Sequence, residues 1–153
     1  MQFVVNEWLL DFLVPNTDKD KIRAVNKFIR FISENDDQIV IGRNNNFVSK
    51  FHHFMKQYGW DADFKQRFKK LRHLLFYDST RTLIIEKDDL ATVDAAIASH
   101  TPDDDVYLVE LAFSTQDRKI VTTDTRLKSA LKNVPEIDVI LLSEFMCGNR
   151  IDC

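Results

Sequence analysis

Side chains that carry oxygen ligands stand just beyond apolar segments of this chain. Asn6 and Glu7 directly follow the first apolar run, and Asp124 directly follows a later one. Three consecutive aspartates, residues 103–105, precede the helix that is expected to lead into that later run. If the apolar runs are parallel strands of one sheet, these side chains lie at the sheet edge where open α/β sheets bind their ligands.

A group of carboxylates at one sheet edge indicates a site for Mg²⁺ or Mn²⁺. These hard cations prefer oxygen ligands, keep several waters, and need only a few protein carboxylates beside the phosphate oxygens of a substrate. The bound cation would lower the pKa of a water for attack on a phosphodiester and would stabilise the charge of the transition state. Helix capping is the alternative role, because aspartates are common at the starts of helices.

Five short apolar runs predict the strands that would hold these side chains. The runs span residues 2–5, 38–41, 82–86, 119–123 and 138–142. They lack the alternation of a half-exposed strand, which is typical of a parallel sheet covered by helices on both faces. The sequence therefore predicts a three-layer α/β/α sandwich with a central, mainly parallel five-stranded sheet.

Apolar residues at helical spacing predict helices between these strands. We expect a helix from a capping-box-like start at Thr17 to about Glu34, and two helices between residues 47 and 75. Three more helices are expected: one that contains Leu90, Val93 and Ile97, one that begins at residues 101–105, and one around residues 127–131. A short tail is expected after the last strand. The chain has no repeat or long linker, so residues 1–153 are predicted to form a single domain.

Composition excludes several classes of protein. Hydrophobic residues make up 44% of the 153 residues and the net charge is −3, which is the balance of a globular chain. No apolar run reaches the ~20 residues of a membrane-spanning helix, and the N-terminus lacks the basic start of a signal peptide, so we expect a soluble cytoplasmic protein. The three glycines of the chain cannot supply a P-loop or a dinucleotide-binding turn. The two cysteines, Cys147 and Cys153, have neither the spacing of a redox pair nor that of a zinc site.

The middle of the chain is basic. Residues 42–82 contain nine basic and three acidic side chains, whereas residues 83–153 contain seven and fourteen. The densest basic cluster consists of Lys65, Arg67, Lys69, Lys70 and Arg72. A phosphate backbone would be attracted to such a surface, so the cluster is a candidate nucleic-acid-binding patch. Phe64, Phe68 and Leu71 alternate with it at helical spacing and are expected to face the core, so the alternative is a solvated helix face.

Three segments together carry a resemblance to a known family. In Asp105-Val-Tyr-Leu-Val-Glu-Leu-Ala112 an aspartate opens a helix and an alanine follows two turns on, and Ile120-Val-Thr-Thr-Asp124 is a strand that ends in Thr-x-Asp. Phe3-Val-Val-Asn6-Glu-Trp-Leu-Leu10 is an opening strand followed by polar residues. In this order the segments resemble those of PIN-domain ribonucleases, and the matches span the whole chain.

The resemblance implies roles for individual residues. Asp105 would be the metal-binding carboxylate at the helix start, and Asp124 would be the one at the strand end. Asn6 stands where the family has its first aspartate, and its amide oxygen can ligate a cation but adds no negative charge. Glu7 or Asp104 would then complete the set of acidic ligands.

The chain also departs from the family pattern around these residues. The family usually has a glutamate on the helix after the second strand, whereas this chain has Phe47-Val-Ser49-Lys50-Phe51 there. Arg126 stands where some members have a further acid. Beside these departures, the resemblance implies that Thr122 or Thr123 is a polar neighbour of the site. The resemblance thus implies an acidic site that is incomplete.

From the resemblance we predict a metal-dependent endoribonuclease that hydrolyses RNA phosphodiesters with Mg²⁺ or Mn²⁺. The family also implies a toxin–antitoxin or defence setting, with a cognate antitoxin or other protein partner and a homodimer. The alternative is a catalytically inactive PIN-like module that binds RNA or a protein. A receiver-like phosphoacceptor domain is disfavoured, because Ser143 and Glu144 stand after the fifth predicted strand where such a domain needs a lysine.

Overall fold

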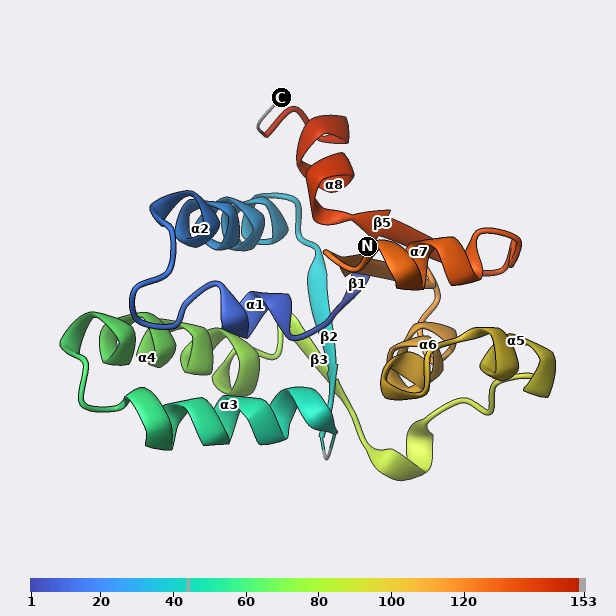
Figure 1. Ribbon diagram of the computed structural model, residues 1–153, viewed down its shortest axis with the longest axis horizontal. Helices are drawn as coiled ribbons and strands as arrows, with labels where there is room; N and C mark the ends of the chain where they lie inside the picture. The colour runs from blue at the N-terminus through green and yellow to red at the C-terminus, as the bar shows by residue number, and fades with distance from the viewer. Residues whose placement is uncertain (44, 152–153) are drawn as a thin grey trace.

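Five strands form the sheet in a computed structural model that describes residues 1–43 and 45–151 (Figure 1). They are β1 (Gln2–Val5), β2 (Gln38–Gly42), β3 (Thr82–Ile85), β4 (Lys119–Thr122) and β5 (Asp138–Leu141). The strand order is β3-β2-β1-β4-β5, and every neighbouring pair is parallel. The predicted three-layer α/β/α sandwich is thereby confirmed. Cys153, one of the two cysteines considered in the sequence, lies outside the described residues.

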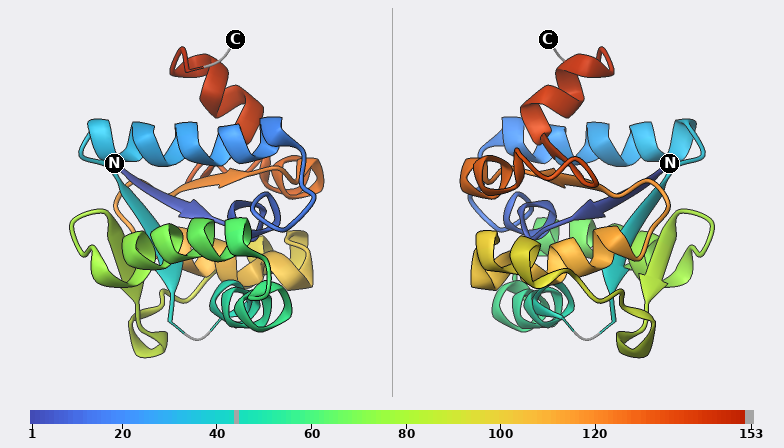
Figure 2. Two further views of the ribbon diagram at one scale, coloured as in Figure 1. Left: turned by 90° about the vertical axis from the view of Figure 1, so that its left-hand side faces the viewer. Right: turned by 90° about the vertical axis from the view of Figure 1, so that its right-hand side faces the viewer.

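Helices cover both faces of this sheet (Figure 2). One layer contains α1 (Trp8–Asp11), α2 (Lys19–Glu34), α3 (Asn46–Tyr58), α4 (Ala62–Tyr77) and α8 (Leu142–Gly148). The other contains α5 (Ala95–His100), α6 (Val106–Phe113) and α7 (Thr125–Leu131), and short 3-10 turns, η1 (Lys87–Asp89) and η2 (Asp103–Asp105), flank α5. Among the described residues, none of the helices has both the length and the apolar character that crossing a membrane requires.

The strands supply the core of both layers by alternation. Phe3 and Val5 pack into the layer of α2, α3, α4 and α8, whereas Val4 packs into the layer of α5, α6 and α7. Such runs are apolar on both faces because successive side chains of a strand point to opposite sides of the sheet. This explains why the strands could be predicted from continuous apolar runs.

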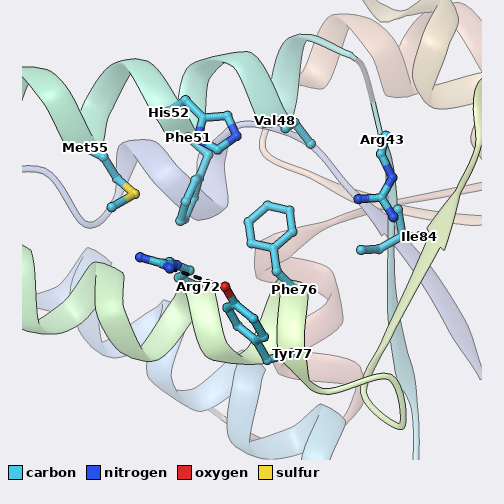
Figure 3. A pocket seen from close by; sticks show the side chains of 9 residues that line it. All are labelled: Arg43, Val48, Phe51, His52, Met55, Arg72, Phe76, Tyr77 and Ile84. Atoms are coloured by element: carbon cyan, nitrogen blue, oxygen red, sulfur yellow. Dashed lines mark hydrogen bonds between the residues drawn. The ribbon is translucent and has the colours of Figure 1, made fainter.

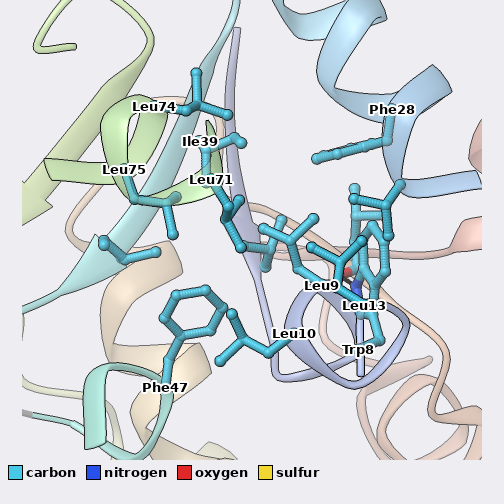
Figure 4. Packing of buried hydrophobic residues seen from close by; sticks show 14 of the residues in the cluster. Trp8, Leu9, Leu10, Leu13, Phe28, Ile39, Phe47, Leu71, Leu74 and Leu75 are labelled. Carbon is cyan, nitrogen blue, oxygen red and sulfur yellow. Dashed lines mark hydrogen bonds between the residues drawn. The ribbon is translucent and has the colours of Figure 1, made fainter. Parts of the chain in front are cut away.

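The short helix α1 is held in place by its buried side chains rather than by its length. Trp8, Leu9 and Leu10 are buried, and Figure 4 shows them among the side chains of the larger core layer. The Trp8 indole Nε1 donates a 2.9 Å hydrogen bond to the carbonyl oxygen of Val121 in β4. A four-residue helix has little stability of its own, so this packing fixes the direction in which the chain leaves β1.

Three predictions about helices were wrong. The cap of α2 is Asp18, whose side chain accepts the backbone N–H of Asp20, and not Thr17. Leu90 and Val93 precede α5 rather than lie in it, although both still pack on the second core layer, because an extended segment can bury them as well. The expected C-terminal tail is instead α8, which buries Leu142, Phe145 and Met146 on one face.

Candidate functional site

The strand order reverses between β1 and β4. From β1 the sheet continues through β2 to β3 on one side, and from β4 it continues to β5 on the other. In open α/β sheets a crevice forms beyond the carboxyl ends of the strands at such a point, because the two connections leave on opposite faces. Asn6 directly follows β1 and Thr123 directly follows β4, so the side chains singled out in the sequence flank this point.

A cleft of about 810 Å³ opens at this point, and we call it the switch-point cleft. All five residues predicted as catalytic line it, namely Asn6, Glu7, Asp104, Asp105 and Asp124. Asp11 lines it too, and the cationic side chains in its wall are Lys50 and Arg126. Five carboxylates thus face two cations, and the excess negative charge favours the binding of a cation.

Asn6 has a buried oxygen atom without a hydrogen-bond partner among the described residues. Only 9% of the residue is exposed, and its Nδ2 donates a 3.0 Å hydrogen bond to Thr122 Oγ1. Its Oδ1 is buried and is, among the described residues, the one buried side-chain nitrogen or oxygen without a hydrogen-bond partner. A buried polar atom without a partner costs about 1–3 kcal/mol, so it requires an explanation such as a ligand.

Thr122 connects the two strand ends. Its buried hydroxyl oxygen accepts the Asn6 amide and also the backbone N–H of Asp124, at 3.0 Å in each case. The alternative polar neighbour of the site, Thr123, is exposed and lines the cleft. Thr122 therefore orients the amide of one candidate ligand and the backbone of another.

Asp105 does not act as a helix cap, although it stands at the N-terminal boundary of α6. Its side chain makes no capping hydrogen bond, so the capping role left open by the sequence does not apply to it. Partial burial raises the pKa of the Asp105 carboxyl, and the nearby carboxylates of Asp124 and Glu7 raise it further against the opposing charge of Arg126. These like-charge effects indicate that the carboxylates share one neighbourhood.

Asp124 combines a capping role with a place in the cleft. Its Oδ1 accepts the backbone N–H groups of Arg126 at 2.8 Å and Leu127 at 3.3 Å, and its Oδ2 lies 3.5 Å from the guanidinium of Arg126. Burial raises the pKa of the Asp124 carboxyl, but these hydrogen bonds outweigh burial, and the pKa lies below its usual value. The carboxylate is therefore ionised at neutral pH.

Tyr107, which no sequence pattern singled out, contacts the site through Glu7. Its hydroxyl donates a 2.9 Å hydrogen bond to Glu7 Oε2, across 100 residues of sequence. Burial raises the pKa of the Tyr107 hydroxyl above its usual value, and the charge of Glu7 raises it further, so the hydroxyl remains a donor. Tyr107 thus orients Glu7 from α6, and no sequence spacing predicts such a contact.

The N-terminal part of α3 also lines the cleft, through Asn46, Ser49 and Lys50. Lys50 Nζ lies 2.7 Å from Asp11 Oδ1 and 5.4 Å from the centre of the Phe54 ring. Where the resemblance implies a glutamate, the cleft therefore contains a lysine paired with Asp11. The start of α3 packs tightly on β2, because a Cβ atom at Gly42 would lie only 2.5 Å from Asn45 Nδ2.

The predicted basic patch lies on α4. Lys65, Lys69, Lys70 and Arg72 are exposed, and Phe64, Phe68 and Leu71 face the core as expected. Arg67 is half-buried and donates hydrogen bonds of 3.3 and 3.0 Å to the carbonyl oxygen of Leu13, so it holds the segment after α1. The five basic residues are not part of the lining of the switch-point cleft.

The ligand atoms of the cleft suit a hard cation. Asn6 Oδ1 and the carboxylates of Asp105 and Asp124 offer only oxygen, which Mg²⁺ and Mn²⁺ prefer. Among the described residues, no group of three or more His, Cys, Asp or Glu side chains is arranged to hold a metal ion. A Mg²⁺ site with one or two carboxylates, an amide oxygen and several waters does not need such a group. The chain matches no protein-family model, no curated protein and no solved structure.

Proposed function

We propose that this protein is a divalent-cation-dependent endoribonuclease and that the switch-point cleft is its active site. The observation that carries the proposal is the buried Oδ1 of Asn6, which has no hydrogen-bond donor among the described residues, in a residue that lines a cleft rich in carboxylates. An unsatisfied acceptor beside mutually repelling carboxylates is unfavourable in the free protein. A bound cation would relieve both penalties, which supports a metal site over a purely structural one.

Asn6 Oδ1 and the carboxylates of Asp105 and Asp124 would hold the cation. When bound, the cation would lower the pKa of a water for attack on a phosphodiester and would offset the charge that develops on the phosphate. Glu7, which Tyr107 orients, would accept the proton of the attacking water.

The two cations of the cleft would contact the substrate. An acidic cleft repels a phosphodiester, so cationic side chains near the reacting phosphate are required for binding. Lys50 and Arg126 both line the cleft, and each lies beside an aspartate. They would bind the phosphate oxygens that the cation does not contact. RNA is the substrate that the PIN-like order of segments favours.

Cleavage of a mixed RNA panel tests the proposal. We expect the wild-type protein to cut RNA with Mn²⁺ or Mg²⁺ and not with EDTA, and the variant Asp105→Asn/Asp124→Asn to be inactive. Glu136→Gln is the matched control, because Glu136 is exposed and precedes β5 at the opposite edge of the sheet. No cutting by folded wild-type protein, or equal cutting by the double variant, would refute the proposal.

A catalytically inactive module that binds RNA or a protein is the second candidate. The observation that favours it is Lys50, which with Asp11 occupies the part of the cleft where a complete site would have an acid. RNA binding by the wild-type protein without metal-dependent cutting would identify this function. The toxin–antitoxin or defence setting, an antitoxin partner and a homodimer remain predictions.

A further inference from the structure

A second depression lies between α3 and α4, and we call it the α3–α4 groove. It measures about 430 Å³. Figure 3 shows Phe76 at its centre, with His52 on the α3 side and with Arg72 and Tyr77 on the α4 side. Arg43, which follows β2, stands at one end of the groove. The groove therefore combines planar rings with two guanidinium groups.

Each guanidinium group has a hydrogen-bond partner, although both arginines are exposed. Arg72 Nη2 donates a 3.3 Å hydrogen bond to the Tyr77 hydroxyl, and its guanidinium lies 5.7 Å from the centre of the Tyr77 ring. Arg43 Nε donates a 2.8 Å hydrogen bond to Glu86 Oε1. A side chain that is restrained before binding loses less entropy when it contacts a phosphate. The groove thus presents two positioned anion-binding groups.

The rings of the groove offer faces for stacking. The His52 and Phe76 rings are nearly parallel, with an interplanar angle of 16° and centres 6.4 Å apart. Tyr77 is 65% exposed, so the face of its ring is accessible to a ligand. Aromatic faces beside positive charges are how proteins bind single-stranded nucleic acids, because every base has a face that can stack.

A third hollow lies between the groove and the switch-point cleft and shares lining residues with both. This hollow, of about 470 Å³, shares Asn46 and Asp104 with the cleft and Arg43 with the groove. The three depressions therefore adjoin one another around the start of α3. The switch-point cleft is rich in carboxylates, whereas the α3–α4 groove carries the two arginines.

We propose that the α3–α4 groove binds a nucleotide unit of single-stranded RNA whose scissile phosphate lies in the switch-point cleft. Arg43 and Arg72 would contact phosphates, and a base would stack on Tyr77 or Phe76. The inference rests on the proposed function, since the acidic cleft attracts a cation but repels a polyanion and so needs binding energy from a neighbouring basic surface. The bases of an RNA duplex are stacked within the helix, so the groove selects single strands.

Binding of a short, fluorescently labelled single-stranded RNA, measured by anisotropy in EDTA, tests this site without cleavage. We expect Arg43→Gln/Arg72→Gln to weaken binding about 10-fold and to reduce the slope of log affinity against log salt by about 0.7 for each phosphate that the variant no longer neutralises. Tyr77→Ala should weaken binding roughly 5-fold or more, because a base can no longer stack on the ring. Lys132→Gln, an exposed change just after α7, is the control and should bind as the wild type does.

The outcomes separate this inference from the proposed nuclease. Wild-type affinity in both groove variants, or equal affinity for a duplex of the same sequence, would overturn the groove. Metal-dependent cutting with an unchanged KM in the groove variants would also overturn it while supporting the nuclease. Groove-dependent binding by wild-type protein and by Asp105→Asn/Asp124→Asn, without any cutting, would support the groove and refute the nuclease.

Discussion

The side-chain amide of Asn6 donates a 3.0 Å hydrogen bond to the hydroxyl of Thr122 and so joins the ends of β1 and β4 where the strand order reverses. The bond uses the nitrogen of the amide, and in the described part of the chain the amide oxygen has no donor. Because Thr122 also accepts the backbone N–H of Asp124, one buried hydroxyl positions two candidate ligands that lie far apart in sequence. The stability of the fold and the geometry of the cleft therefore depend on the same pair of side chains.

Thr122→Val should destabilise the protein with little change in shape. The variant leaves the Asn6 amide and the Asp124 backbone N–H without their acceptor, and an unsatisfied buried donor costs about 1–3 kcal/mol. We expect urea denaturation to show a loss of roughly 2 kcal/mol in the free energy of unfolding. Thr123→Val is the matched control, because Thr123 is exposed. This change should alter the free energy of unfolding by less than about 0.5 kcal/mol. Equal effects of the two changes would show that the Thr122 hydroxyl is not needed.

Asn6→Asp should strengthen cation binding and lower the stability of the cation-free protein. A carboxylate at this nine-tenths buried position adds a negative charge beside Asp105 and Asp124, so we expect a lower melting temperature in EDTA. With Mn²⁺ the added attraction should tighten binding on the order of 10-fold, which calorimetric titration would measure. Asn133→Asp, an exposed change, is the control. Mn²⁺ affinity no higher than that of the wild type would rule out Asn6 as a ligand.

Asp105→Asn should stabilise the cation-free protein. The substitution removes one charge from a half-buried group that Asp124 and Glu7 repel. In EDTA at neutral pH we expect the melting temperature to rise on the order of 2 °C. Glu136→Gln, which removes an exposed carboxylate elsewhere, should leave it nearly unchanged.

The gain from Asp105→Asn should depend on pH. Because the pKa of Asp105 is raised in the folded protein, the folded state binds this proton more tightly than the unfolded chain does. Protonation of Asp105 therefore stabilises the folded state. This stabilisation is complete below the pKa of an aspartate in the unfolded chain, about 3.9, and it is lost as the pH rises through the pKa of Asp105 in the folded protein. The difference in melting temperature between variant and wild type should therefore be largest near neutral pH and should shrink toward about pH 4. An equal difference at both pH values would contradict this electrostatic cause.

Tyr107→Phe should impair cleavage without unfolding the protein. The change removes the hydroxyl that donates to Glu7 Oε2 but keeps the ring, which packs on the core layer of α5, α6 and α7. If Glu7 accepts the proton of the attacking water, poorer orientation should lower kcat roughly 10-fold and leave KM nearly unchanged. Tyr58→Phe, a change on α3, is the control. An unchanged kcat, or a rise in KM alone, would show that Tyr107 does not act through Glu7.

The sheet and the location of the cleft were predictable from local patterns. Residues 2–5 form β1 as predicted, because consecutive apolar residues such as Phe3, Val4 and Val5 suit a strand buried on both faces. The carboxyl ends of parallel strands share one edge, so Asn6, Glu7 and Asp124 were expected to lie near one another, and they do. Helix α8 was missed because it directly continues the apolar run of β5, and strand and helix patterns cannot be separated there.

The roles of the two central aspartates could not be predicted, because they depend on the backbone. Asp105 and Asp124 both stand at the start of a helix, yet only Asp124 caps it. The backbone of Asp124 is extended, so its carboxylate reaches the first N–H groups, whereas Asp105 already has a helical conformation after η2. Contacts across the cleft, such as Lys50 with Asp11, depend on how helices pack and leave no trace in sequence spacing.

Titration of Mn²⁺ into the cation-free protein, followed through the EPR signal of free Mn²⁺, tests the metal-binding cleft most directly. We predict saturable binding by the wild type and by Glu136→Gln, and binding at least about 10-fold weaker by Asp105→Asn/Asp124→Asn. No binding by folded wild-type protein, or equally tight binding by the double variant, would contradict a cation site at the junction of β1 and β4.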